Sequence, residues 1–257
     1  MIWNIDPVLI HLGPLEIHYY GILFALALLL AYELARKLCK AKKLPLELLD
    51  SLTIYLVIGL IVGARLGHIV FYELAYYLAH PLQILKVWEG GLASHGAAIG
   101  LLITYGLFLW RHQKVRFFDF ADLLVIVACI PVSFIRLGNF FNSELVGRAT
   151  EVPWAVTFTR VDDLARHPSQ LYEFGMGIVL FAILMALWHS RRKTIQSGFF
   201  FGLFFMLYFA MRFTVEFFKE FPLHENFFNL TTGQMLSLPF FALGTIVMLR
   251  TYERKYR

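Results

Sequence analysis

The sequence has few charged residues. They make up only 16% of its 257 residues, whereas hydrophobic residues make up 59%. Soluble domains carry about 25% charged residues. The hydrophobic residues fall into long runs, which excludes the short alternating segments of a transmembrane β-barrel. Because a helix needs about 20 apolar residues to cross a bilayer, the composition predicts an all-α polytopic membrane protein.

Cysteine is nearly absent. Cys39 lies in a Lys-rich connection and Cys129 lies inside an apolar run, so we expect two unpaired thiols rather than a disulfide. Neither cysteine belongs to a CxxC motif or to another metal-ligand spacing, and we therefore expect no metal site. The Gly-rich phosphate loop and the nucleophile elbow of hydrolases are also missing, and we expect no bound cofactor.

Positive charge is missing from the first 17 residues, so we expect no cleavable signal peptide. The net charge of +5 comes from basic residues that lie mostly between the apolar runs. Charges in such connections set the orientation of a membrane protein. We therefore expect membrane lipid, and no nucleic acid, among the partners.

Seven apolar runs have the length of a membrane span: residues 19–35, 52–72, 92–110, 120–136, 171–188, 198–218 and 234–249. Alternate connections hold 15 of the 23 Lys and Arg residues: Arg36, Lys37, Lys40, Lys42, Lys43, Arg111, Lys114, Arg116, Arg191, Arg192, Lys193, Arg250, Arg254, Lys255 and Arg257. The positive-inside rule then places the N-terminus outside and the C-terminus in the cytoplasm. We expect one integral membrane domain over residues 1–257, with an extracytoplasmic element at residues 137–170 and residues 1–18 along the outer surface.

Several ionisable residues lie within these spans, where charge is costly and indicates a functional site. Arg65, Arg136 and Arg212 come late in spans that run outward. His95 and Tyr20 come early in spans that run inward. These residues therefore share the outer half of the membrane, and we predict a polar cavity that opens toward the outer leaflet.

Structural alternatives exist for individual members of this set. Arg65 could extend to the interface or pair with Glu73. Arg212 could pair with Glu216, which follows four residues later on the same helical face. His95 could be a packing residue.

The residue types in this set suit a phospholipid. Arginine donates paired hydrogen bonds to phosphate, and the phosphate at this depth belongs to a lipid head group. His95 can move a proton near neutral pH, and Tyr20 can donate or accept a hydrogen bond. With no evident protein nucleophile, the set indicates direct transfer from a phospholipid to an external acceptor. A transporter and a non-catalytic phospholipid-binding scaffold remain alternatives.

Residues 136–147 read RLGNFFNSELVG. They resemble the signature Arg-x-Gly-Asn-Phe-x-Asn-x-Glu-x-x-Gly of the bacterial prolipoprotein diacylglyceryl transferases. Further motifs of that family match in order at residues 18–21, 90–96, 166–173, 212–218 and 233–237. One position departs from the family pattern: the family often has a second glycine where this chain has Ala97, after Gly96.

The resemblance implies an enzyme of the bacterial cytoplasmic membrane that moves a diacylglyceryl group from phosphatidylglycerol to the lipobox cysteine of a prolipoprotein signal peptide. We expect Arg136 and Arg212 to grip the phosphate, and His95 with Tyr20 to deprotonate the thiol. Glu216 is expected to orient Arg212. The remaining predicted lipid-binding residues are Asn139, Asn142, Glu144 and Gly147, and we expect Gly138 and Gly147 to permit tight turns.

Overall fold

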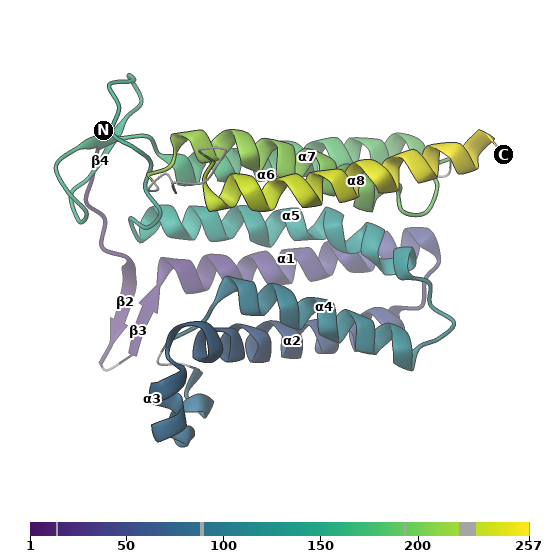
Figure 1. The fold of residues 1–257 in the computed structure, drawn as a ribbon, viewed down its shortest axis with the longest axis horizontal. Helices are drawn as coiled ribbons and strands as arrows, with labels where there is room; N and C mark the ends of the chain where they lie inside the picture. Colours follow the sequence, from purple (N-terminus) through teal and green to yellow (C-terminus); the bar gives the residue numbers. More distant parts are fainter. Residues whose placement is uncertain (14, 88–89, 193, 221–229, 257) are drawn as a thin grey trace. The chain divides into compact units, whose positions relative to one another are not determined.

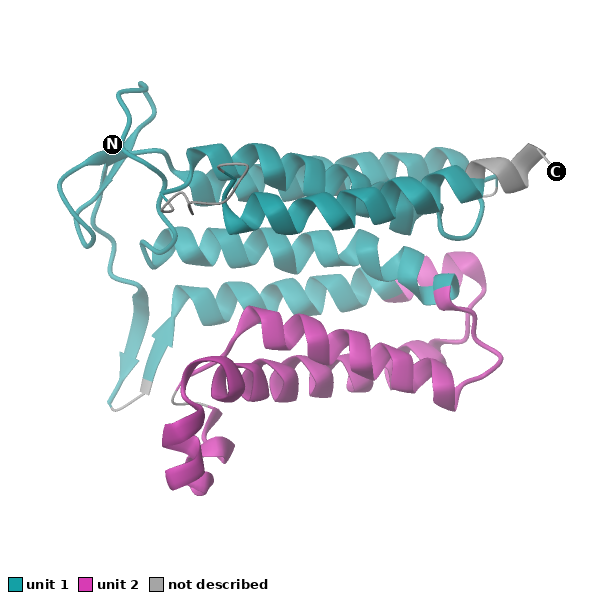
Figure 2. Cartoon of the chain, viewed as in Figure 1, with its two compact units in different colours: residues 1–35, 118–257 teal, residues 36–117 magenta. Residues whose placement is uncertain are grey.

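The computed structural model describes residues 1–13, 15–87, 90–192, 194–220 and 230–256. Lys193 and Arg257, two of the basic residues counted above, lie outside the described residues. The chain forms two compact units (Figure 2): unit 1 comprises residues 1–35 and 118–257, and unit 2 comprises residues 36–117.

The described chain is mainly helical, with short strands (Figure 1). The elements in order are β1 (Ile2–Trp3), β2 (Val8–Leu12), β3 (Leu15–His18), α1 (Tyr19–Lys42), α2 (Leu46–Tyr72), α3 (Leu74–Ala79), η1 (Pro81–Leu85), α4 (Ser94–Arg111), α5 (Phe117–Phe141), β4 (Val156–Phe158), β5 (Ala165–Arg166), α6 (Ser169–Arg191), α7 (Phe199–Val215), η3 (Glu216–Phe218) and α8 (Thr232–Tyr256).

Helices cover most of each of the seven predicted runs. Among the described residues, five helices have the length and composition of a membrane span, and they are α2, α5, α6, α7 with η3, and α8. The chain is therefore a largely helical polytopic membrane protein, as the composition predicts. The count of seven spans and their orientation stay predictions.

Unit 2 is built on close contact between α2 and α4. A Cβ atom added to Gly63 would lie 2.5 Å from the carbonyl oxygen of Gly96, and one added to Gly100 would lie 2.0 Å from that of Gly59. Small residues spaced four apart let two membrane helices approach to backbone contact. This packing fixes the start of α4, where His95 lies in the first turn.

Unit 1 is organised around α5, which has half of its apolar window buried, the largest share among the five candidate spans. Helix α6 approaches α5 at Gly177, where an added Cβ atom would lie 2.1 Å from Ser133 Oγ. Helices α7 and α8 meet at Gly244, where an added Cβ atom would lie 2.4 Å from the backbone nitrogen of Met206. These helices run side by side in Figure 1.

A buried carboxylate holds the start of α7 against α5. Asp122 accepts hydrogen bonds from the backbone N–H groups of Gly198, at 2.8 Å, and Phe201, at 2.9 Å. The first N–H groups of a helix lack partners within the helix, and their partial positive charge favours an anion. This contact fixes the position of α7 along its own axis. It therefore also fixes the height of Arg212, which lies in the last turn of that helix.

Short strands form a small element in unit 1. Strand β1 pairs in parallel with β4, which pairs antiparallel with β5, whereas β2 and β3 form a separate hairpin. The side chains of Trp3, Phe140, Val156 and Phe158 form its hydrophobic core. Residues 137–170 therefore contain two strands, β4 and β5, and the N-terminal segment adds β1 to the same sheet.

Candidate functional site

The signature stretch starts on the last turns of α5, which extends to Phe141, and then reverses direction. Ser143 has a left-handed backbone with φ of 56°, and its N–H donates to Phe140 O at 3.1 Å. The N–H of Glu144 donates to Asn139 O at 2.9 Å, which completes a Schellman motif. The reversal folds the chain back along α5, so the side chain of Glu144 returns to the helix it has just left.

The carboxylate of Glu144 joins the two asparagines of the signature. Its Oε2 accepts a hydrogen bond from Asn139 Nδ2 at 2.8 Å, and its Oε1 accepts one from Asn142 Nδ2 at 3.1 Å. The start of α6 holds the same turn through two buried side chains. Gln170 Nε2 donates to Glu144 O at 2.6 Å, and Ser169 Oγ donates to Leu145 O at 2.8 Å. The turn is therefore held on both sides.

Gly138 and Gly147 allow close packing rather than tight turns, because neither has a positive φ. A Cβ atom on Gly138 would lie 2.5 Å from Tyr20 Cδ2. One on Gly147 would lie 2.4 Å from His167 O and 2.6 Å from Phe218 O. The first glycine lets an aromatic ring of α1 rest on α5. The second lets three backbone segments meet.

Three cations meet on the carboxylate of Glu173, in the first turns of α6. Its Oε2 lies 3.1 Å from Arg136 Nε, and its Oε1 lies 3.3 Å from Arg212 Nη1 and 2.9 Å from Lys219 Nζ. Lys219 Nζ also lies 3.2 Å from Glu216 Oε2. The side chain of Glu173 is only 2% exposed. A charge so deeply buried needs paired partners, and these three cations supply them.

The two arginines form the exposed side of this cluster. Their side chains are 19% and 24% exposed for Arg136 and Arg212, against 4% for Lys219. Arg136 Nη1 also donates to Asn139 Oδ1 at 3.4 Å. Among the described residues, no hydrogen bond or ion pair uses Arg136 Nη2 or the Nε and Nη2 of Arg212. Two partly exposed arginines therefore keep donors that suit a phosphate.

The carboxylate of Glu216 does not pair with Arg212 as expected. Helix α7 ends at Val215 and Glu216 begins the 3-10 helix η3, although the N–H of Glu216 still donates to Arg212 O. Its carboxylate lies against the start of α8, where a Cβ atom on Gly233 would be 2.2 Å from Oε1. In the part of the chain that the structure describes, Arg212 pairs with Glu173 in place of Glu216.

Tyr20 belongs to the same region of unit 1. Its ring lies against Gly138, one of the glycines of the signature. The structure thus brings one predicted catalytic tyrosine to the signature. His95 is exposed and belongs to unit 2, and its place beside these residues stays a prediction.

Arg65, the third arginine within a predicted span, forms its hydrogen bonds with the backbone of its own chain. Its side chain is buried within unit 2, and its guanidinium lies 4.9 Å from the centre of the Tyr77 ring. It donates to five backbone carbonyl oxygens, those of Gln83, Ile84, Lys86, Gly90 and Gly91. A guanidinium has five N–H donors, so no donor remains for a phosphate.

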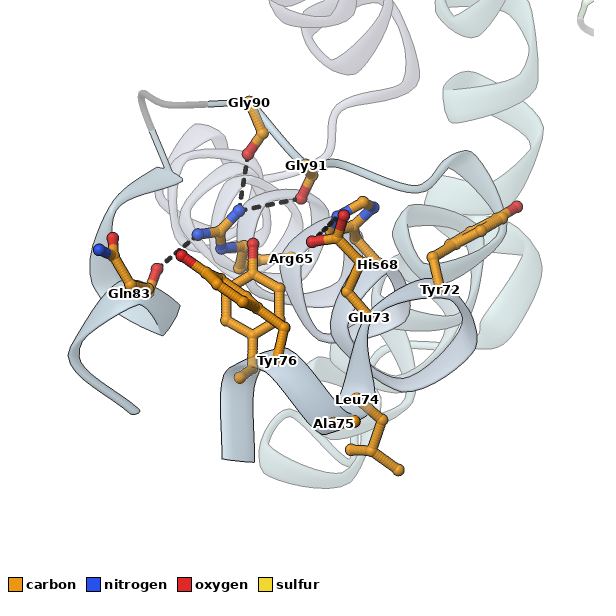
Figure 3. A pocket seen from close by; sticks show the side chains of 11 residues that line it. Arg65, His68, Tyr72, Glu73, Leu74, Ala75, Tyr76, Gln83, Gly90 and Gly91 are labelled. Carbon is orange, nitrogen blue, oxygen red and sulfur yellow. Dashed lines mark hydrogen bonds and ion pairs between the residues drawn. The ribbon is translucent and has the colours of Figure 1, made fainter. Parts of the chain in front are cut away.

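Arg65 is one of the residues that line a cavity of about 690 Å³. Figure 3 shows its guanidinium between Gln83 on one side and Gly90 and Gly91 on the other. The alternative pairing of Arg65 with Glu73 does not form. The Glu73 Oε2 atom instead lies 3.3 Å from His68 Nε2. Arg65 therefore acts as a structural tie.

Three side chains, those of Trp154, His167 and Tyr172, form a hydrogen-bonded series between the strand element and α6. His167 Nδ1 lies 3.0 Å from the Tyr172 hydroxyl, which accepts a hydrogen bond from Trp154 Nε1 at 2.7 Å. Burial lowers the pKa of His167, and the positive charge of Arg148 lowers it further. The surroundings of His167 therefore favour its neutral form.

The family model described as prolipoprotein diacylglyceryl transferase matches residues 7–250. The chain belongs to the prolipoprotein diacylglyceryl transferase family. Three relatives of this family carry the name phosphatidylglycerol–prolipoprotein diacylglyceryl transferase. The one from Tolumonas auensis is 47% identical over the full length of both chains. Those from Chloroherpeton thalassium and Bacteroides fragilis are 37% and 39% identical, over 98% of this chain and 94% and 96% of theirs.

Sequence reasoning identified this diacylglyceryl transferase chain from its motifs but assigned no role to Glu173 or Lys219. Glu173 closes the family motif at residues 166–173 and lies early in an apolar helix. The cost of a carboxylate there is the same signal that identified the arginines. Lys219 gave a weaker signal, because a lysine at the end of a span is usually solvated.

Proposed function

We propose that this chain transfers the diacylglyceryl group of phosphatidylglycerol to the lipobox cysteine of prolipoproteins, the first step of lipoprotein maturation. The observation that carries the proposal is the convergence of two partly exposed arginines, Arg136 and Arg212, on one buried carboxylate, with Nη2 of each left without a partner among the described residues. Family membership supplies the reaction class. We also propose seven spans in the bacterial cytoplasmic membrane, as a single domain with its site toward the outer leaflet.

The reaction replaces a carbon–oxygen bond with a carbon–sulfur bond. The thiol loses its proton to His95, helped by Tyr20, because the thiolate is the nucleophile. The sulfur attacks the diacylglyceryl carbon that carries the phosphate ester. Glycerol 1-phosphate leaves with the electron pair of the broken bond, and a thioether remains on the peptide.

Arg136 and Arg212 bind the phosphate and stabilise the charge that grows on the leaving group. Interactions that strengthen in the transition state accelerate the reaction, whereas those equal in both states do not. Asn139, Asn142 and Glu144 hold Arg136 and the head group in place. Gly147 keeps the turn beneath them close to the start of α6.

The test is a transfer assay with purified protein in phosphatidylglycerol vesicles and a lipobox peptide, read by the mass shift of the peptide. Arg136→Ala and Arg212→Ala should each reduce product at least about 100-fold while the protein stays folded. Arg160→Ala is the matched control, because Arg160 is an exposed arginine of unit 1 with a single 4.0 Å pair to Asp6. Near-normal product from both site variants would exclude the phosphate grip.

His95 needs its own variant. His95→Asn keeps a polar side chain of similar size but cannot accept the thiol proton near neutral pH, so we expect a strong loss of rate. A rate near that of the parent protein would remove His95 from the mechanism. Absence of turnover in the parent protein would instead favour the scaffold, and lipid flux without turnover would favour the transporter.

A further inference from the structure

Glu173 touches both arginines of the proposed phosphate grip and uses a different oxygen for each. Oε2 lies 3.1 Å from Arg136 Nε, and Oε1 lies 3.3 Å from Arg212 Nη1. The two arginines come from α5 and α7, whereas Glu173 lies on α6. One carboxylate therefore connects the ends of three helices and sets the distance between two guanidinium groups.

The contacts also set the direction of each arginine. Glu173, whose side chain is only 2% exposed, occupies Nε of Arg136 and one terminal nitrogen of Arg212. Asn139 occupies Nη1 of Arg136. Among the described residues Nη2 of each arginine has no protein partner, and the two side chains are 19% and 24% exposed. A planar guanidinium held at one edge presents its opposite edge in a fixed direction.

The charge of the cluster suits one phosphodiester. Arg136, Arg212 and Lys219 carry three positive charges, and Glu173 and Glu216 carry two negative ones. One net positive charge remains for a head group that carries one negative charge. Loss of the Glu173 charge would leave two net positive charges. These would still bind the lipid, but the two arginines would no longer be held in a fixed orientation.

We infer that Glu173 is the positioning residue of the phosphate grip, which holds Arg136 and Arg212 at the spacing and angle that phosphate stabilisation requires. This inference rests on the proposed function and adds a residue to it. Lys219 neutralises Glu173 but has a flexible stem and no planar fork, so it cannot fix the spacing itself.

The test separates positioning from charge balance. Glu173→Gln should lower kcat about 100-fold, as expected for a misplacement of about 1 Å, without raising KM for phosphatidylglycerol or for the lipobox peptide. Glu173→Asp keeps the charge on a shorter stem and should recover part of kcat. Glu151→Gln is the control, because Glu151 is an exposed carboxylate of the same unit, and it should change neither constant.

A double variant covers the case in which Glu173→Gln folds poorly because the buried Lys219 loses one of its two carboxylate partners. Glu173→Gln with Lys219→Met restores the net charge of the cluster but not the link between the arginines. We expect folded yield to recover and kcat to stay low. Recovery of kcat in the double variant, a kcat within threefold of the parent for Glu173→Gln, or Glu173→Asp no better than Glu173→Gln would each overturn the inference. An inactive parent protein would overturn the proposed function instead.

Discussion

Gly138→Ala tests whether the Tyr20 ring must rest directly on α5. The added Cβ atom would lie 2.5 Å from Tyr20 Cδ2 and 3.1 Å from Cγ, whereas ordinary contacts lie at 3.4–4 Å. The ring must move by about 1 Å, and a misplacement of that size costs about 100-fold in rate. We therefore expect transfer activity to fall about 100-fold.

Stability should change much less than activity. Replacing a helical glycine by alanine stabilises a helix by about 1 kcal/mol, and overpacking costs about 1–3 kcal/mol. The net loss is then at most about 2 kcal/mol, which leaves the protein folded.

The assay compares initial transfer rates per folded enzyme, with the folded fraction measured by gel filtration in detergent. Gly175→Ala is the matched control, because Gly175 lies in α6 and its added Cβ atom would have nothing within 4 Å. This control should keep full activity. A Gly138→Ala rate within threefold of the parent, or an equal loss in the control, would refute the reasoning.

Three further predictions follow from other contacts. Gly147→Ala places a Cβ atom 2.4 Å from His167 O, a backbone atom, so both the melting temperature and the transfer rate should fall, and an unchanged melting temperature would contradict this. Folding lowers the pKa of His167, so the stability that this histidine contributes is complete above pH 6.5, the usual pKa of histidine, and is lost as the pH falls toward the lowered pKa. The melting temperature of His167→Gln should therefore fall less between pH 7 and pH 5 than that of the parent protein. Arg65→Lys keeps the charge but offers three donors in place of five. At least two partly buried carbonyls then lose a hydrogen bond to a charged group, at about 1.5–3 kcal/mol each, and hydrogen exchange at residues 83–86 should rise.

The helices were predictable because apolar runs of span length leave the backbone no other way to satisfy its hydrogen bonds in lipid. The strands were harder to predict from the sequence. Strand β1 pairs with β4 across more than 150 residues, and nothing in two short segments so far apart indicates their pairing. The helical extension of α5 through Asn139 was also missed, because the Schellman motif at its end uses Ser143 rather than the usual glycine.

The site was predictable to the extent that charge in a membrane is costly. That rule identified Arg136 and Arg212, but it gave Arg212 the wrong partner. Sequence spacing relates residues only along one helix, so it favoured Glu216. The observed partner, Glu173, comes from another helix, and that contact depends on how α5, α6 and α7 pack.

Arg65 shows a second limit of the same rule. Placing Arg65 within the membrane costs as much free energy as placing either of the other two arginines there. Its partners, however, are backbone carbonyls, which every residue carries. No sequence pattern marks such partners, and the arginine therefore resembled a ligand-binding residue.

The reliance of Arg65 on carbonyl oxygens has a consequence for how this segment can evolve. The identity of the side chains at positions 83, 84 and 86 does not enter those hydrogen bonds, so they are open to substitution as long as the backbone keeps its path. Positions 90 and 91 are different, because their φ values of 90° and 69° favour glycine. A library that varies positions 65, 83, 84, 86, 90 and 91 should therefore show one intolerant arginine, two intolerant glycines and wide variation at positions 83, 84 and 86.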